Sequence, residues 1–361
     1  MLLDSTIIKK IPSAENMSGT CSDFAESVLD GGTLAEQYEV FAKKGMDRGD
    51  VLRAVAGCLD SGCLDVEFEA RSDVLKKVIG GGEEAEEICR GNPHMWNVVA
   101  YEKEWKDFAD FNDFMQKGSP VYNKKQYQWK VYEGLLGKEL GVLGAGSRVL
   151  DIGGGTGRIG LRLAEKGCDV TLIDASPAAL KAAWRELAAA GADFDIAWAD
   201  AADLSFIENG SMDAAFSMEV YCYIREPEVA LSEAVRCVRS GGTVSFSVEN
   251  GLGAILADPY VEIKDMPKIL SENRMLVEGD VCVDYIPVSR LRGMSVKSGL
   301  TDVRIEGCHY IADGFIGKRF SDRLFGAGPA SDFMIEMEKG MKRIPVLKHL
   351  CRAWLVTGTV K

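Results

Sequence analysis

Two kinds of hydrophobic periodicity divide the chain. From Thr33 to about Gly118, apolar residues recur at three- and four-residue spacing, which is typical of amphipathic helices. From Arg148 to Asn250, short apolar runs alternate with helical segments, two of which begin at proline and end at glycine. Strands separated by helices of this length predict right-handed crossovers and a parallel sheet covered on both faces. We therefore expect an α/β fold with a doubly wound, mostly parallel sheet and an N-terminal helical region.

The chain has 361 residues, more than one average domain. We divide it into residues 1–120, a helical accessory or lid region, and residues 121–361, a main α/β domain. Less regular stretches at about 251–290 and 312–350 predict inserts within the main domain. Because additions to a common scaffold often carry function, we expect the N-terminal helices and the first insert to select the substrate.

Charge and cysteine usage narrow the classes of function. The formal net charge of −13 disfavours nucleic acids, whose binders normally display a basic surface. Ten cysteines without a C-x-x-C pair and three histidines predict no metal site and reduced thiols in the cytoplasm. There is no apolar run of 18 residues and no signal-peptide core near the N-terminus, so we expect no membrane span. These features favour a small-molecule substrate and leave the oligomeric state open.

A glycine-rich loop follows the first predicted strand of the main domain. In "RVLDIGGGTGRIG", Gly155, Gly157 and Gly160 satisfy G-x-G-x-x-G, and Asp174 follows 19 residues after Gly155, as in dinucleotide-binding proteins. Electrostatics favours another ligand. A pyrophosphate binds where a helix N-terminus attracts negative charge, and the carboxylate of Asp151 directly before the loop would repel it. The same carboxylate suits S-adenosylmethionine, which carries an ammonium and a sulfonium and has no phosphate.

The segment "VLDIGGGTG" resembles the first motif of the class I S-adenosylmethionine-dependent methyltransferases. Its acidic residue and glycine triplet match Asp151, Gly153, Gly155 and Gly157. In that family the loop backbone approaches the methionine part of the cofactor, and the acidic residue helps to hold its amino group. The resemblance implies a Rossmann-like methyltransferase fold with a seven-stranded sheet whose last strand is antiparallel.

The later strands continue this resemblance. Asp174, at the end of "VTLID", matches the carboxylate that binds both ribose hydroxyls. Asp200, after "FDIAWAD", matches the residue that accepts the adenine amino group, and Ala201 offers its backbone N–H to the ring. The other residues expected at the cofactor are Ala175, Ser217 and Tyr122, the last in a segment "SPVYN" that is a candidate lid.

Candidate catalytic residues lie where strands of the main domain end. They are Glu219, Tyr221, Tyr223 and His309. Small-molecule relatives often read M-E-V-L-E-H after the fourth strand, and Tyr223 stands where they have histidine, so that base is absent here. Each candidate has a structural alternative: Glu219 as an orienting group, the tyrosines as an aromatic wall, and His309 as a hydrogen-bonded structural residue. We assign the aromatic cluster from Trp96 to Phe114 to the core rather than to a pocket.

The expected function is S-adenosylmethionine-dependent methyl transfer by in-line displacement to a small molecule through an O, N, S or C nucleophile. Three alternatives stay open. The chain could methylate a protein or RNA and use its N-terminal helices for docking. It could be an NAD-dependent oxidoreductase, or a non-catalytic relative that only binds the cofactor.

Overall fold

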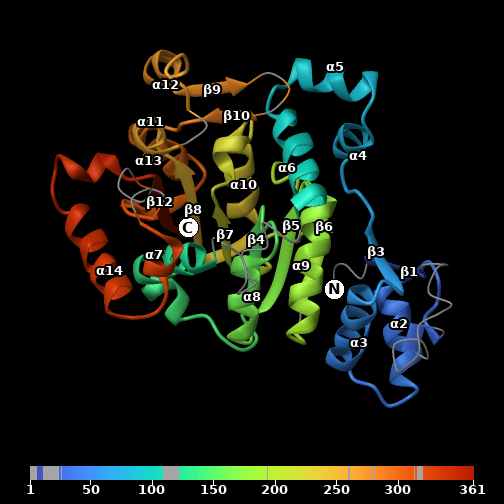
Figure 1. The fold of residues 1–361 in the computed structure, drawn as a ribbon. Helices are drawn as coiled ribbons and strands as arrows, with labels where there is room; N and C mark the ends of the chain where they lie inside the picture. Colours follow the sequence, from blue (N-terminus) through green and yellow to red (C-terminus); the bar gives the residue numbers. More distant parts are fainter. Residues whose placement is uncertain are drawn as a thin grey trace.

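A seven-stranded sheet forms the centre of the computed structural model (Figure 1), which describes residues 6–10, 24–25, 27–108, 122–192, 194–258, 261–277, 279, 281–312, 314 and 320–361. The strand order is β11-β12-β8-β7-β4-β5-β6. The strands are β4 (Arg148–Ile152), β5 (Asp169–Asp174), β6 (Phe194–Trp198), β7 (Met212–Met218), β8 (Val238–Glu249), β11 (Leu300–Cys308) and β12 (Ala353–Val360). β12 is antiparallel to both of its neighbours, and the pairs within β4–β8 are parallel. The predicted fold class is confirmed.

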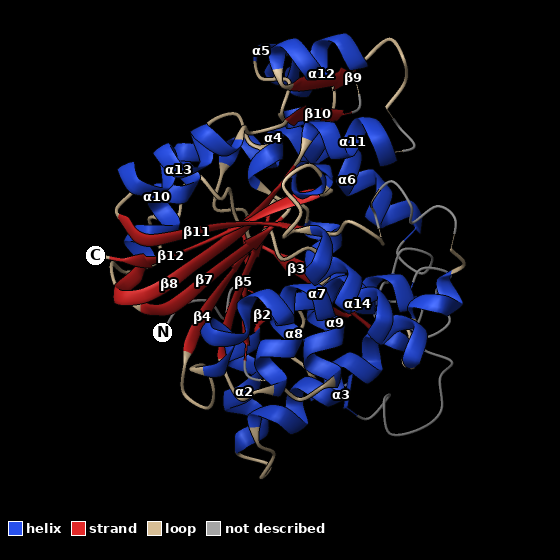
Figure 2. Cartoon of the chain, turned by 90° about the vertical axis from the view of Figure 1, so that its left-hand side faces the viewer, coloured by secondary structure: helices blue, strands red, loops and turns tan. Residues whose placement is uncertain are grey.

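Helices cover both faces of this sheet (Figure 2). The central strand β4 has Val149, Leu150 and Ile152 fully buried, as expected for a parallel sheet between helix layers. α8 (Arg158–Glu165) and α9 (Pro177–Ala189) lie on one face, and α10 (Pro227–Cys237) and α13 (Val288–Lys297) lie on the other. The start of α9 follows from its sequence, because the side chain of Ser176 accepts a hydrogen bond from the N–H of Ala179 at 3.1 Å.

The N-terminal region contains the predicted helices and also strands that the periodicity did not indicate. Its helices are α2 (Leu34–Ala42), α3 (Arg48–Asp60), α4 (Asp73–Gly80), α5 (Glu83–Gly91) and α6 (Met95–Phe108). β1 (Thr6–Lys10), β2 (Gly32–Thr33) and β3 (Leu64–Phe68) form a small antiparallel sheet. These strands are two to five residues long and pair with segments far along the chain, so no local pattern marks them. After β3, Ala70 pairs with Trp198 at the free edge of β6 and joins the region to the main sheet.

Two groups of elements interrupt the main domain. The first holds α11 (Gly251–Ala257), α12 (Met266–Glu272) and a hairpin of β9 (Arg274–Val277) and β10 (Val281–Asp284), at the top of Figure 1. The second holds η4 (Asp322–Phe325), α14 (Pro329–Met341) and η5 (Leu347–Leu350); η4 and α14 pack against α7 (Tyr122–Gly141), and η5 packs against α11. The buried carboxylate of Glu338 on α14 accepts hydrogen bonds from the N–H groups of Tyr310 and Ile311, both at 2.9 Å.

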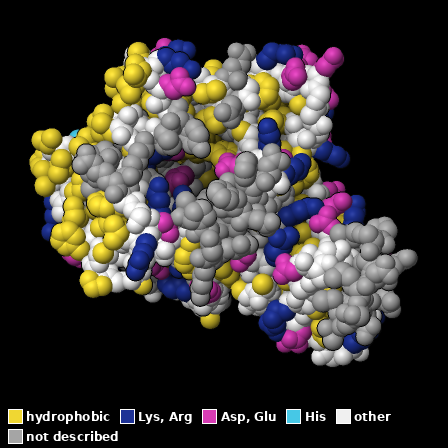
Figure 3. All heavy atoms as spheres, in the orientation of Figure 1, with side chains coloured by type: hydrophobic (Ala, Val, Ile, Leu, Met, Phe, Trp, Pro, Cys, Tyr) yellow, Lys and Arg dark blue, Asp and Glu magenta, His cyan; other side chains and the backbone are white. Residues whose placement is uncertain are grey.

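The outer surface of these inserts is partly apolar. Figure 3 shows hydrophobic side chains gathered on the left, over the region of α11 and α14. The exposed apolar residues there include Leu252, Leu256, Phe333, Ile344 and Val346. Among the described residues, no helix combines the length and the apolar character needed to cross a bilayer.

Substitution of Trp184 tests how much its packing against β6 contributes to stability. Its side chain is fully buried, and its ring packs edge-on against Phe194 with 6.0 Å between the centroids. Trp184→Ala should lower the free energy of unfolding by about 3–5 kcal/mol, because the lost contacts leave a cavity. Urea denaturation measures this. The control Val142→Ala, at a site that is 78% exposed, should change stability by less than about 0.5 kcal/mol. Equal effects of the two substitutions would contradict this packing.

Candidate functional site

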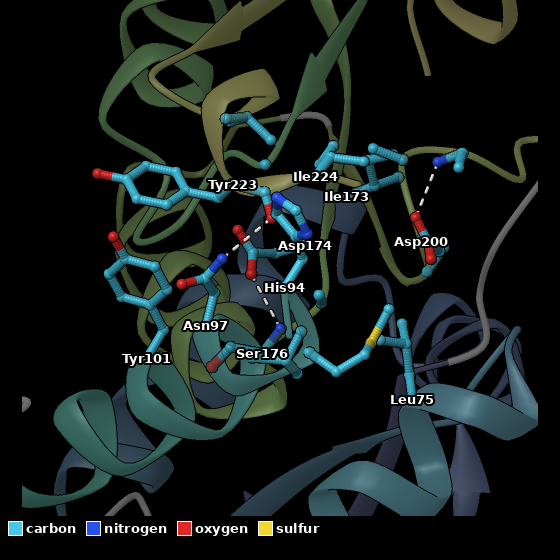
Figure 4. Close-up of a pocket in the computed structure, with 18 of the residues that line it drawn as sticks. Leu75, His94, Asn97, Tyr101, Ile173, Asp174, Ser176, Asp200, Tyr223 and Ile224 are labelled. Atoms are coloured by element: carbon cyan, nitrogen blue, oxygen red, sulfur yellow. Dashed lines mark hydrogen bonds between the residues drawn. The ribbon is translucent and has the colours of Figure 1, made fainter. Parts of the chain in front are cut away.

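A cavity of about 440 Å³ lies over the carboxyl ends of β4, β5, β6 and β7 (Figure 4). Strand order reverses between β4 and β7, which is where α/β sheets bind ligands. α6 from the N-terminal region forms the opposite wall, and Leu75 of α4 also contributes. The volume is in the range of small-molecule sites. Residues of both the main domain and the accessory region therefore line the cavity.

The glycine loop forms one wall of this cavity. Gly153 and Gly155 line it, with φ angles of 64° and 56° that favour glycine. A Cβ at Gly153 would collide with the side chain of Val220, whereas a Cβ at Gly155 would meet nothing within 4 Å. The loop thus packs closely on one side and leaves the backbone of Gly155 open to a ligand. Gly157 does not line the cavity; with a φ of 81° it forms the N-cap of α8.

Two carboxylates lie at adjacent strand ends, as predicted. Asp174 accepts hydrogen bonds from the N–H groups of Gly155 and Ser176, both at 2.9 Å, and burial raises the pKa of Asp174. Asp200 accepts one from the N–H of Ala202 at 2.9 Å. The structure brings together six of the residues predicted at the cofactor: Gly153, Gly155, Asp174, Ala175, Asp200 and Ala201.

Asp151 does not lie where the electrostatic argument from the sequence placed it. It is 1% exposed, lies beneath the loop rather than at the cavity, and accepts a hydrogen bond from the N–H of Gly160 at 2.9 Å. Burial raises the pKa of Asp151 to about 7. This residue therefore stabilises the turn from beneath the loop and does not line the cavity.

The charge of the cavity comes from other side chains. Figure 3 shows a hollow near the centre of this face with acidic side chains beside it. Among the described residues, those that line the cavity and carry formal charges are Asp174, Asp200, Glu219, Glu226 and Arg225. Four carboxylates against one guanidinium favour a cationic ligand and oppose a pyrophosphate. The expected cofactor fits this lining, although the reason differs from the one that Asp151 suggested.

Four other candidates lie outside the residues that line the cavity. They are Tyr122, Ser217, Tyr221 and His309. Tyr221 is fully buried against Phe246, with ring centroids 5.1 Å apart, and His309 is 1% exposed and packs edge-on against Tyr132 at 4.5 Å.

The local geometry explains these placements. Successive strand residues point to opposite faces, so Met218 lines the cavity and Ser217 is buried beside it. In η2 (Tyr221–Tyr223), Tyr223 lines the cavity, whereas Tyr221 enters the core. Tyr122 begins α7, and residues 119–121 of the candidate lid lie outside the described residues.

Glu219 lines the cavity in a constrained conformation. Its φ angle is 63°, a region that residues other than glycine rarely adopt. Its N–H donates to the carbonyl oxygen of Ser247 at 3.1 Å and to the hydroxyl at 3.0 Å, and its carboxylate accepts from the hydroxyl of Tyr132 at 3.0 Å. Contacts with α7 and β8 thus hold both the backbone and the side chain of Glu219 at the end of β7.

Tyr223 forms an aromatic wall. Its hydroxyl donates to Oε1 of Glu249 at 2.8 Å, and the same oxygen accepts from Arg352 at 2.8 Å. Burial raises the pKa of Tyr223 well above its usual value, and the charge of Glu249 adds to this effect. The phenol therefore stays protonated at neutral pH. Tyr101 of α6 packs edge-on against it, with 5.6 Å between the ring centroids.

Tyr101 and Trp105 of α6 line the cavity, so their assignment to the core was wrong. Asn97, Tyr101 and Trp105 follow one another at four-residue spacing, so they share a helix face, and that face lines the cavity. The side-chain amide of Asn97 donates to the carbonyl oxygens of Tyr223 (3.1 Å) and Cys282 (2.8 Å) and accepts from the N–H of Cys282 (2.9 Å). An asparagine inside an aromatic stripe was the available signal, because a buried amide requires polar partners from another segment of the chain. Phe111 and Phe114 of the same cluster lie outside the described residues.

A buried carboxylate fixes α6 over the strand ends. Glu102 is 5% exposed, and its Oε2 accepts from the hydroxyl of Ser176 at 2.7 Å and from the N–H of Ala178 at 2.9 Å. Both donors lie at the start of α9, where the helix dipole favours a negative charge. Lys106 pairs with the other carboxylate oxygen at 2.9 Å. The accessory region is thereby anchored two residues from Asp174.

Comparisons with known proteins find methyltransferases among the similar chains. A family model described as a methyltransferase domain matches residues 150–246. The ubiquinone biosynthesis O-methyltransferase of Aromatoleum aromaticum is 34% identical over 171 residues, which are 46% of this chain and 69% of that protein. The protein of the same name from Thiobacillus denitrificans gives the same figures. A solved geranyl diphosphate C-methyltransferase from Streptomyces coelicolor is 16% identical with a TM-score of 0.44, covering 69% of this chain and 87% of its own.

The raised pKa of Asp151 predicts a pH dependence of stability. Between about pH 4 and pH 7 the folded state keeps a proton that the unfolded aspartate has lost, so stability falls as pH rises through this window. The slope is up to roughly 1.4 kcal/mol per pH unit. Asp151→Asn keeps an acceptor for the N–H of Gly160 and cannot ionise.

Urea denaturation of both proteins from pH 4 to pH 8 measures this effect. The unfolding free energy of the wild type minus that of Asp151→Asn should decrease up to about pH 7 and then level off. A difference that stays constant, or grows with pH, would show that Asp151 is ionised throughout the window.

Proposed function

The chain belongs to the class I S-adenosylmethionine-dependent methyltransferases, and from this premise we propose that it methylates a hydroxyl oxygen of a small, flat acceptor. S-adenosylmethionine is its methyl donor and supplies a methyl group already activated by a sulfonium. The observation that carries the proposal is the cavity at the strand ends, with carboxylates on one side and aromatic side chains from α6 and η2 on the other.

The carboxylate side of the cavity is the proposed cofactor site. Asp174 has two of its lone pairs occupied by backbone N–H groups, which fixes its orientation and leaves acceptor capacity for the two ribose hydroxyls. Asp200 and the backbone of Ala201 would hold the adenine, and the open backbone at Gly155 would approach the methionine part. The negative lining would stabilise the cationic sulfonium.

The aromatic side of the cavity is the proposed acceptor site. Tyr101, Trp105 and Tyr223 provide flat apolar surfaces, and Met218 adds an adaptable contact. Such walls align the acceptor with the methyl group, and alignment contributes several kcal/mol to catalysis of a displacement. Oxygen as the acceptor atom is supported by the matched relatives, which are named O-methyltransferases.

The surroundings of the cavity support a small acceptor over a protein or RNA. α6 and the hairpin that Asn97 ties to it lie over the strand ends, where a macromolecule would need an open groove. The acidic lining also opposes a phosphate backbone, just as it opposes the pyrophosphate of NAD.

Substitution of Asp174 tests the cofactor site. Asp174→Asn should weaken binding of S-adenosylmethionine by about 100-fold, because a neutral amide replaces a charged acceptor of two hydrogen bonds. Calorimetric titration measures the affinity. Asp203→Asn, at an exposed position three residues after Asp200, is the matched control and should bind like the wild type. Tight binding of NADH without a response to S-adenosylmethionine would overturn the proposal.

Transfer of a labelled methyl group tests the acceptor atom. The wild-type protein would be incubated with methyl-labelled S-adenosylmethionine and, in separate reactions, catechol, aniline and thiophenol. We expect label on the oxygen of catechol, because aromatic side chains line the cavity and the matched relatives are named O-methyltransferases. Label on aniline and none on catechol, or no transfer by a protein that binds the cofactor, would contradict the proposal.

A further inference from the structure

His94 lies directly before α6 and lines the cavity, although no pattern in the sequence drew attention to it. Its side chain is 4% exposed, and its Nε2 lies 3.2 Å from Oδ2 of Asp284 on β10. Arg274 on β9 donates to the same carboxylate at 2.8 Å. Burial alone would raise the pKa of Asp284, but the hydrogen bonds from His94 and Arg274 lower it to about 2.

The ionised carboxylate determines which imidazole nitrogen carries the proton. A carboxylate can only accept hydrogen bonds, so Nε2 of His94 is the protonated nitrogen, and the neutral ring has its lone pair on Nδ1. That Nδ1 is buried and has no hydrogen-bond partner among the described residues. A buried basic nitrogen without a partner is costly unless a ligand supplies one. Figure 4 shows this imidazole among the side chains around the cavity.

We propose that His94 is the general base for the acceptor hydroxyl, with Asp284 as its orienting partner; this inference rests on the proposed function. The hydroxyl proton passes to Nδ1 of His94 as the acceptor oxygen forms a bond to the methyl carbon. The carbon–sulfur bond breaks, and its electron pair stays on sulfur as a neutral thioether. The resulting imidazolium is stabilised by Asp284, as in other histidine–carboxylate pairs.

The position of this pair agrees with the rest of the site. The N–H of Asn97 donates to the carbonyl oxygen of His94 at 3.1 Å, and the amide of Asn97 binds β10 and η2. Asn97 therefore holds the backbone of His94 and also links α6 to η2 and β10 beside the cavity. Relatives often carry a histidine at the position of Tyr223. In this chain the histidine comes from the accessory region instead, directly before α6.

The first test compares His94→Gln with His349→Gln, a control at an exposed histidine on η5. Glutamine can still donate to Asp284 but has no basic nitrogen. With catechol, His94→Gln should lower kcat by about 100-fold. With thiophenol, which is largely ionised at the assay pH of 8, kcat should stay within about twofold. Binding of S-adenosylhomocysteine should match the wild type in both variants.

A pH profile separates a base from a structural residue. In the wild type, kcat with catechol should fall as the pH is lowered, and this fall should disappear in His94→Gln, which has no base to lose. Asp284 binds His94, Arg274 binds Asp284, and Arg225 and Glu226 line the same cavity; all four are retained in this variant. Asp284→Asn should also lower kcat with catechol, because the imidazolium loses its partner.

The tautomer of His94 can be measured without any methyl transfer, because the chain has only three histidines. ¹⁵N-correlated NMR of the wild type, with His94→Gln to assign the signals, should show His94 protonated on Nε2 at neutral pH and should lose this fixed tautomer in Asp284→Asn. A proton on Nδ1 would overturn the inference. So would a wild type that methylates catechol alongside an equally active His94→Gln. A wild type that methylates no hydroxyl would contradict the proposed function instead.

Discussion

The site depends on one buried contact between the accessory region and the main domain. The carboxylate of Glu102 lies at the start of α9 and accepts hydrogen bonds from Ser176 and Ala178, so it positions α6 over the end of β5. A carboxylate is stable there because it meets the positive end of a helix dipole and the unpaired N–H groups of the first turn. Ser176 also donates its own N–H to Asp174. The turn at Ser176 therefore fixes both α6, which forms one wall of the cavity, and the carboxylate of Asp174.

The accessory region consequently contributes to the chemistry of the site. The face of α6 that carries Asn97, Tyr101 and Trp105 supplies the aromatic wall, and Asn97 joins the hairpin of the first insert to η2. Residues that are far apart in the chain thus line one cavity. A methyltransferase sheet provides the donor site, and the additions around it would decide which molecule receives the methyl group.

The charge of the cavity is a property of its lining and does not come from the residue directly before the glycine loop. Asp151 lies beneath the loop, where burial raises its pKa to about 7 and its Oδ2 accepts a hydrogen bond from the N–H of Gly160. The carboxylates that face the cavity come from the ends of β5, β6 and β7 and from the segment after η2. A carboxylate that lines the cavity acts on a ligand more strongly than one that lies behind a packed backbone, so its position matters more than the residue type.

The sequence by itself determined the alternation of strands and helices, the parallel sheet with its final antiparallel strand, and the meeting of Gly155, Asp174 and Asp200 at one cavity. These features follow from local periodicity, turn residues and spacing along consecutive strands. The tertiary structure decided the rest: the short strands β1 and β3, the burial of Tyr221 and His309, and the entry of His94 and α6 into the cavity. Those outcomes depend on contacts between distant segments, and a periodic pattern states which face of a helix is buried but not what that face is buried against.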